Sequence, residues 1–308
     1  MRPVLIAALA VAGLAAGPAL RAVIAALSVP SGRPWRRFCP ACNWPLPPAA
    51  AQLVSWRVTR PGRRVASAAE PGQRAASAAG PGQQAASAAG PGQRVASAAG
   101  PGRRTARAAR AALPVLPPDG RCPACRARLG PPALTVEVTA AVVAGALAAR
   151  IHPVLVLTAM CWLAACTIPL AYVDAAVRRL PDLLTVPAYA GTAVLLLAAA
   201  ADDGSWSQLG RGLLGGAGYA AFCLVLFLLS PSGMGPGDVK LAASLGTALA
   251  WLSWGALIEG ALAGFLLGAV YGVTLLARGR AGRKTQLPFG PFMIAGTFLV
   301  LVITGLPG

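Results

Sequence analysis

Two aspartates, Asp174 and Asp238, are the residues best suited to do chemistry in this sequence. Only nine of the 308 residues are acidic, and these two lie at the ends of long apolar runs. An ionisable side chain in that setting is costly and usually has a function. Two carboxylates that meet share a proton. One can then act as a general base on water while the other acts as a general acid.

The sequence around Asp238 fits such chemistry. Asp238 lies between two apolar runs in GMGPGDVKL, where Gly233, Gly235, Pro236 and Gly237 predict a break in regular helix. An open backbone would let an extended substrate segment come close to the carboxylate. Spacing alone also leaves two other roles open for the aspartates, as helix-end caps or as the ion relay of a transporter.

Four cysteines form a second group with chemical potential. They occur in two identical CPAC segments, Cys39 and Cys42 in the first, Cys122 and Cys125 in the second. Two Cys-x-x-Cys pairs can place four thiolates at the corners of a tetrahedron, which suits structural zinc. Such a site has no open position for catalysis, so zinc is expected to hold a loop fold together. A redox role for one pair is the alternative.

The other acids and cysteines have plainer interpretations. Asp182 and Glu259 lie near the ends of apolar runs, and Glu137 could pair with a basic residue beside the cysteine loop. The chain has one histidine, His152, far from the acids, which disfavours a Ser-His or Cys-His nucleophile pair. The last three cysteines lie in apolar runs and are expected to be small core residues: Cys161, Cys166 and Cys223.

Eight apolar runs could position these groups. The chain is 56% hydrophobic and 12% charged, whereas a soluble domain carries about 25% charged residues. We therefore predict an all-α, polytopic membrane helix bundle of about eight transmembrane helices. The predicted spans are 4–27, 133–149, 154–173, 183–201, 210–229, 239–254, 256–277 and 288–305. The sixth and seventh are separated by few residues, so a count of seven stays open.

The basic residues predict how these spans are oriented. More than half of the 27 lysines and arginines lie between Arg33 and Arg128, in the loop after the first span. Positively charged connections stay in the cytoplasm, so this loop and both aspartates are expected at the cytoplasmic side, with both termini outside. The net charge of +18 is thus explained by membrane orientation, and no nucleic-acid partner is expected.

Three parts are expected along the chain: a first transmembrane helix (1–28), a cytoplasmic zinc-binding loop (29–132) and a membrane-embedded domain (133–308). A decapeptide repeats inside the loop at about 61–110, with units such as PGQRAASAAG and PGQQAASAAG. Each unit joins a Pro-Gly turn to an Ala/Ser run without large apolar side chains, so a flexible insert is predicted. The insert could lie against anionic lipid headgroups, or it could be a solvated spacer.

Together these motifs resemble those of the type IV prepilin peptidases, intramembrane aspartyl proteases of the Gly-x-Gly-Asp kind. The matching segments are GRCPACRARL leading into TVEVTAA, Asp174 followed by LPDLLT, GMGPGDVKLAASLG, and QLPFGPFMIAG before the last span. The resemblance runs over nearly the whole chain apart from the repeats. The resemblance implies that Asp174 and Asp238 are the catalytic aspartates of the membrane domain, and that the four cysteines bind zinc.

The resemblance also implies substrates and further site residues. The substrates would be prepilins or pseudopilins of type IV pili or protein secretion systems. They would be cut after a glycine at the cytoplasmic face of the bacterial inner membrane. On the matching motifs, the substrate-binding and active-site loop would comprise Gly235, Gly237, Lys240, Asp182, Pro288, Phe289 and Gly290.

Many members of this family also methylate the new N-terminus with S-adenosylmethionine. They often carry Gly-Ser-Phe-x-Asn after the centre of the first span, where this chain has GPALRAVIAAL from Gly17. N-methylation is therefore expected by analogy alone. Two functions outside this family stay open: a zinc-loop membrane scaffold in which the aspartates are structural, and a small ion-coupled transporter with a broken helix at Asp238.

Overall fold

The structure is a computed structural model of the chain. The residues that it describes are 2–29, 36, 38–44, 120–122, 124–132, 134–230, 234–279 and 288–305. The decapeptide repeats that were predicted as a flexible insert lie outside these residues.

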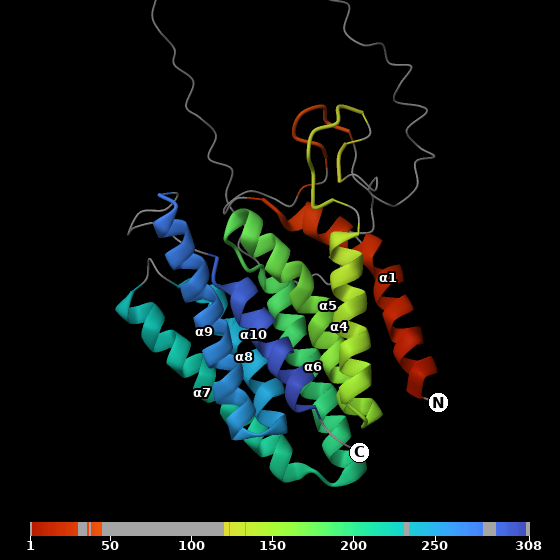
Figure 1. Cartoon of the computed structure of the whole chain (residues 1–308), viewed down its shortest axis with the longest axis vertical. Helices are drawn as coiled ribbons and strands as arrows, with labels where there is room; N and C mark the ends of the chain where they lie inside the picture. The colour runs from red at the N-terminus through yellow and green to blue at the C-terminus, as the bar shows by residue number, and fades with distance from the viewer. Residues whose placement is uncertain are drawn as a thin grey trace, which may run out of the picture. The chain divides into compact units, whose positions relative to one another are not determined.

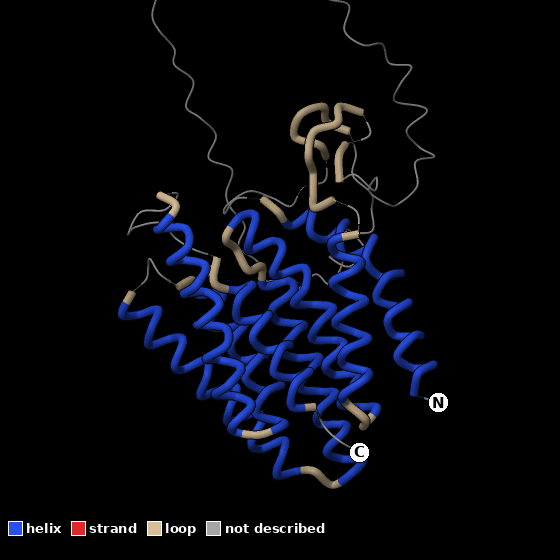
Figure 2. The backbone as a smooth tube through the Cα atoms, viewed as in Figure 1, coloured by secondary structure: helices blue, strands red, loops and turns tan. Residues whose placement is uncertain are grey.

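Eight α-helices build the described part of the chain (Figure 1). They are α1 (Arg2–Leu27), α4 (Thr135–Arg150), α5 (Val154–Val177), α6 (Asp182–Asp203), α7 (Trp206–Leu229), α8 (Pro236–Leu252), α9 (Trp254–Ala277) and α10 (Gly290–Thr304). The described residues form no β-strand (Figure 2). Arg121 and Arg128 share an isolated β-bridge. The predicted all-α fold is confirmed.

Five of these helices are long and apolar enough to cross a membrane: α1, α5, α6, α7 and α9. The other three, α4, α8 and α10, are only 15 to 17 residues long. The short helix α8 is also the most enclosed, with Leu241, Leu245 and Leu249 fully buried and with α6, α7, α9 and α10 packed around it. Three long helices, α6, α7 and α9, and the short α10 therefore surround a short central helix, which carries Asp238 in its first turn.

The helix ends agree with the predicted spans to within a few residues, with two differences beside the aspartates. Helix α5 continues past the predicted end at 173, so Asp174 lies in its last turn. It stops at Arg178, which adopts a left-handed conformation with φ 52°. Helix α8 begins at Pro236, so the predicted irregular backbone ends at Gly235. Proline favours the first helical position because its fixed φ suits a helix and the N–H it lacks would have no partner there.

Glycines bring α9 and α10 into close contact. Gly260, Gly264, Gly268 and Gly272 recur at every fourth position of α9, and all four are buried. A Cβ atom on Gly264 would lie 3.1 Å from the Cα atom of Met293 in α10. Small residues let helices approach closely in a membrane, where the hydrophobic effect does not drive their association. This contact places the start of α10 beside α5 and α8.

Helices α1 and α4 are joined by a small-residue contact and a buried ion pair. Gly13 and Gly17 face α4 so closely that a Cβ atom on either would collide with Ala140 or Glu137. Nε of Arg21 lies 2.6 Å from Oε1 of Glu137, with side chains 6% and 9% exposed. Glu137 thus pairs with a basic residue, as the sequence indicated. Its partner, however, belongs to α1 and not to the cysteine loop.

At the end of the bundle away from the aspartates, two arginines cap other helices. Nε and Nη2 of Arg211 in α7 donate to the carbonyl oxygens of Ala250 and Trp251 at 2.7 and 2.6 Å. Nε of Arg150 in α4 likewise donates to Val302 O at 2.8 Å. The last carbonyls of a helix have no partner within it, and a guanidinium satisfies them. Both arginines therefore fasten the ends of short helices, α8 and α10.

Candidate active site and cysteine cluster

Asp174 and Asp238 converge at the first residue of α10. The two side chains belong to α5 and α8 and are 5% and 6% exposed. The backbone N–H of Gly290 donates to Oδ2 of Asp174 at 3.2 Å. A Cβ atom built on Gly290 would lie 3.0 Å from Oδ2 of Asp174 and 3.6 Å from Oδ1 of Asp238. The carboxylates therefore lie on either side of the space that a side chain at position 290 would occupy. Only glycine leaves this space open.

The first turn of α8 fixes the orientation of Asp238. The backbone N–H of Gly235 donates to its Oδ2 at 2.9 Å, and its own N–H donates to Gly235 O at 3.0 Å. The second oxygen, Oδ1, is buried and has no hydrogen-bond partner among the described residues. A buried acceptor without a partner costs free energy, and such an atom calls for a functional explanation. This oxygen is the one that faces Gly290.

The other residues of the predicted active-site loop fall into two groups. Gly235, Gly237, Phe289 and Gly290 lie at the helix starts around the carboxylates. Gly237 leaves room for Leu180, whose Cβ would lie 2.7 Å from a Cβ atom on the glycine. The ring of Phe289 packs at 4.8 Å from that of Phe265. Pro288, directly before Phe289, is half-buried.

Lys240 and Asp182 form the second group, at the surface. Nζ of Lys240 lies 2.6 Å from Oδ1 of Asp182, and the side chains are 53% and 64% exposed. Residues two apart on a helix do not face each other, so Lys240 points away from Asp238. The structure therefore gives this pair the role of joining the starts of α6 and α8, separate from the buried carboxylates.

The four cysteines of the CPAC segments form one cluster. Their Sγ atoms all lie within 4.8 Å of one another. Two contacts, Cys39 with Cys125 and Cys42 with Cys122, measure 3.5 Å. Zn–S bonds of about 2.3 Å would separate the sulfur atoms by roughly 3.8 Å at the corners of a tetrahedron. The cluster thus has the donor set and the spacing of a four-thiolate zinc site.

The two CPAC segments have the same backbone geometry. In the first, the N–H of Asn43 donates to Cys39 O at 2.9 Å, and in the second that of Arg126 donates to Cys122 O at 2.9 Å. Asn43 and Arg126 are both left-handed, with φ of 59° and 58°. Each segment is therefore a tight turn that directs its two thiols to the same side.

Hydrogen bonds favour an ionised thiol at Cys39. Desolvation opposes ionisation, but the backbone N–H groups of Ala41 and Cys42 and the neighbouring thiols outweigh it. Together they lower the pKa of Cys39 to about 7. A backbone hydrogen bond to Trp44 lowers the pKa of Cys42, but desolvation and the neighbouring thiols raise it more. The thiolate is the form that binds metal, and Cys39 is therefore the first thiol of this turn to take that form.

Sequence reasoning missed three residues that position the site or its helices. Leu180, which packs on Gly237, carries no polar signal that would distinguish it. Arg21 could have been noticed, because an arginine inside an apolar run requires a partner. Arg211 lies at the start of the predicted span 210–229, and its role as a cap depends on the end of a different helix, which local sequence does not reveal.

Comparison with known proteins shows what the chain is similar to. Residues 157–273 match the model of the Type IV leader peptidase family. A "Prepilin leader peptidase/N-methyltransferase" of Burkholderia pseudomallei is 34% identical over 183 residues, which cover 58% of this chain and 56% of that protein. Proteins with the same name from Aeromonas salmonicida and Pseudomonas aeruginosa are 30% and 31% identical, over 59% of this chain and 62% of each relative.

The chain therefore spans 56% to 62% of the length of these relatives. No solved structure matches it. The matches confirm the resemblance to type IV prepilin peptidases. With its five membrane-capable helices, the chain is a multi-pass membrane protein whose relatives are bacterial.

Proposed function

We propose that this chain is an aspartic endopeptidase of the membrane that removes the leader peptides of type IV prepilin-like proteins, with Asp174 and Asp238 as its catalytic residues. One observation carries the proposal: two buried carboxylates from different helices meet at Gly290. Both aspartates lie in the segment that matches the leader peptidase family. The names of the relatives support leader cleavage as the reaction.

The pair supplies acid and base together. Two adjacent buried carboxylates cannot both be charged at low cost, so one holds a proton. The ionised one takes a proton from water, whose oxygen attacks the scissile carbonyl carbon. The protonated one donates to the carbonyl oxygen, the C–N bond breaks, and a proton passes to the leaving amine. Each carboxylate accepts one backbone N–H, so hydrogen bonding alone does not distinguish the two roles.

We further propose that zinc binds the cysteine cluster. The ligands would be Cys39, Cys42, Cys122 and Cys125, whose donor type and spacing fit the ion. With four protein ligands the metal would cross-link the two turns and take no part in hydrolysis. The cluster rests on the end of α1, where Ala22 and Ala25 pack with Cys39 and Cys122.

The cytoplasmic face of the inner membrane is the proposed place of cleavage. Helix α5 ends, and α8 and α10 begin, at the end of the bundle that also carries the cysteine cluster (Figure 1). The sequence concentrates its basic residues in the loop around that cluster. The positive-inside bias therefore supports a cytoplasmic location for the cluster and for both carboxylates.

N-methylation is a second candidate activity, favoured by the names of the relatives. In this chain, however, the segment from Gly17 packs as part of α1, and Ala22 to Leu27 are buried. These apolar side chains do not fit the polar groups of S-adenosylmethionine. We therefore derive no methyl-transfer step from the described residues.

A cleavage assay tests the proposal. The chain is co-expressed with a prepilin, and wild type is compared with Asp174→Asn and Asp238→Asn by substrate mass. We expect cleavage by wild type and a loss of about 100-fold or more in each variant. Equal cleavage by all three would overturn the catalytic role of the pair.

The same assay separates the two other functions. A scaffold predicts that both substitutions are silent, and a transporter predicts ion-coupled uptake without cleavage. The same spectrum detects an added methyl group.

A further inference from the structure

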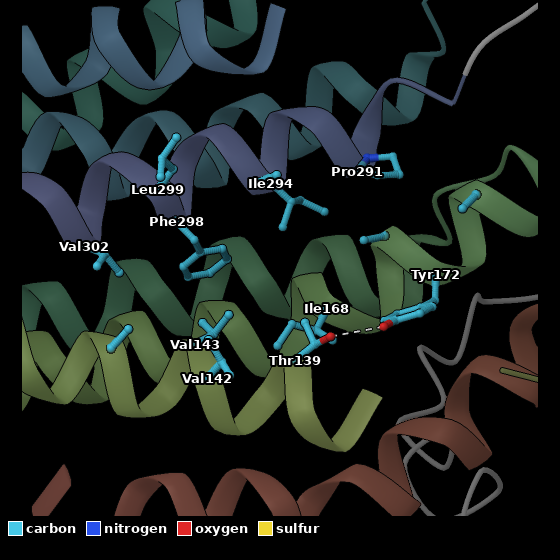
Figure 3. A pocket seen from close by; sticks show the side chains of 14 residues that line it. Thr139, Val142, Val143, Ile168, Tyr172, Pro291, Ile294, Phe298, Leu299 and Val302 are labelled. Carbon is cyan, nitrogen blue, oxygen red and sulfur yellow. Dashed lines mark hydrogen bonds between the residues drawn. The ribbon is translucent and has the colours of Figure 1, made fainter. Parts of the chain in front are cut away.

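An apolar groove runs along the bundle between α4, α5 and α10 (Figure 3). Its volume is about 590 Å³. Figure 3 shows Val143, Ile168 and Phe298 inside it, with Val142 and Leu299 at its rim. Val142 and Leu299 are exposed, so in a bilayer the groove opens toward lipid.

One end of the groove lies at the same level of the bundle as the carboxylates, although neither aspartate lines it. Ala175 and Pro291 line that end, and they directly follow Asp174 and Gly290 in the sequence. From Pro291 the lining continues along α10 to Val302, a distance of about 16 Å at the helical rise. An occupant lying along α10 would therefore begin near the level of the two carboxylates and would extend over about three helical turns.

The lining of the groove suits a helix. It contains no charged residue. Its polar side chains, Thr139 and Tyr172, have hydroxyl groups 3.2 Å apart, and both donate to the carbonyl oxygen of Thr135. Other lining residues are small: Ala146, Ala171, Ala175 and Ala295. In lipid, such surfaces associate with helices because backbones can approach closely and gain van der Waals contact.

We propose that this groove binds the apolar helix of the substrate that follows the scissile bond. This inference rests on the proposed function. A substrate whose scissile bond lies at the carboxylates must place the apolar segment that follows this bond close to them. The bound helix runs in the same direction as α10, with its N-terminal end at Pro291 and about eleven residues in the groove. A lipid acyl chain fits the same space, but binding a lipid gives no reason for the groove to begin one residue after Asp174 and Gly290.

Matched alanine substitutions test the site. Ala295 lies in the groove, whereas Ala269 is exposed on α9 and does not line the groove. Each variant, Ala295→Trp and Ala269→Trp, is assayed on a prepilin with its full apolar segment and on a short peptide that ends six residues after the cleavage site. For each variant, kcat/KM for the long substrate is divided by kcat/KM for the short one. We expect Ala295→Trp to lower this ratio at least tenfold. We expect Ala269→Trp to leave it unchanged.

Photo-cross-linking gives an independent readout. A photoreactive residue is placed at Leu299 in the groove, or at the exposed Leu266 of α9, in the Asp238→Asn background that retains substrate. Cross-links from 299 but not 266 to the substrate helix support the proposal. Cross-links from both positions, or from 299 to lipid alone, overturn it, as does an unchanged ratio in Ala295→Trp. If wild type cuts neither substrate, the proposed function itself has failed.

Discussion

At the scale of single residues, Gly290 keeps open the space between the two carboxylates, where the proposed function requires the substrate to bind. Its N–H holds Asp174, and its missing side chain leaves the point between the two acids open. Gly290→Ala would fill that point with a methyl group at 3.0 Å from Oδ2 of Asp174. We expect kcat/KM for leader cleavage to fall about 100-fold, because a displacement near 1 Å at a catalytic group has that effect.

The control for this variant is Gly218→Ala. Gly218 is also a helical glycine, and a Cβ atom there would meet nothing within 4 Å. Substrate mass spectrometry on equal amounts of purified protein measures both rates. An unchanged rate in Gly290→Ala would show that the space between the carboxylates is not where the reaction occurs.

A second residue-scale prediction separates the exposed ion pair from the buried acids. Lys240→Gln and Asp182→Asn each remove one partner of a pair that is more than half exposed. Exposed pairs contribute about 0–1 kcal/mol, so each substitution should change the cleavage rate by less than about fivefold. If either substitution lowered the cleavage rate as much as Asp238→Asn does in the same assay, the pair would belong to the active site.

At the scale of helices, Arg211 ties the end of α8 to α7. Its guanidinium donates to three carbonyl oxygens, those of Ala250, Trp251 and Leu252. Arg211→Gln leaves carbonyls of α8 without partners, and hydrogen bonds to a charged group contribute about 1.5–3 kcal/mol each. We expect a loss of about 2 kcal/mol or more in the free energy of unfolding, seen as a lower Tm in detergent. Arg278→Gln, at the exposed end of α9, should leave the Tm unchanged.

Local sequence could predict the helices but not all of their mutual contacts. The five long helices could be predicted as membrane spans because runs of about 20 apolar residues have few alternatives in a membrane. The meeting of Asp174 and Asp238 was also expected, since both were placed at the same membrane face. Gly290 was named by motif, but its contact with both acids depends on how α10 packs against α9. The capping roles of Arg150 and Arg211 could not be predicted, because a cap on a distant helix leaves no local pattern.

At the scale of the whole molecule, the cysteine cluster links segments far apart in the chain. Cys39 and Cys125 are 86 positions apart and lie 3.5 Å from each other. We expect purified wild-type protein to contain about one zinc ion per chain, measured by elemental mass spectrometry. Cys39→Ser and Cys122→Ser should lose the metal, whereas Cys161→Ser, in α5 and away from the cluster, should keep it. Wild-type protein without zinc, purified in the absence of chelators, would contradict the assignment.

The contact between Arg150 and α10 has a consequence for the order in which the protein is made. The carbonyl oxygen of Val302 that Arg150 caps lies 152 positions later in the chain, so a ribosome reaches it roughly 10–30 s after Arg150. Until then α10 is absent, and Arg150 has no carbonyl oxygen of that helix to bind. Gly290 has not been synthesised, and the groove is formed by α4 and α5 alone. On the proposed function, a nascent chain is therefore unable to cut a passing substrate until α10 has been synthesised.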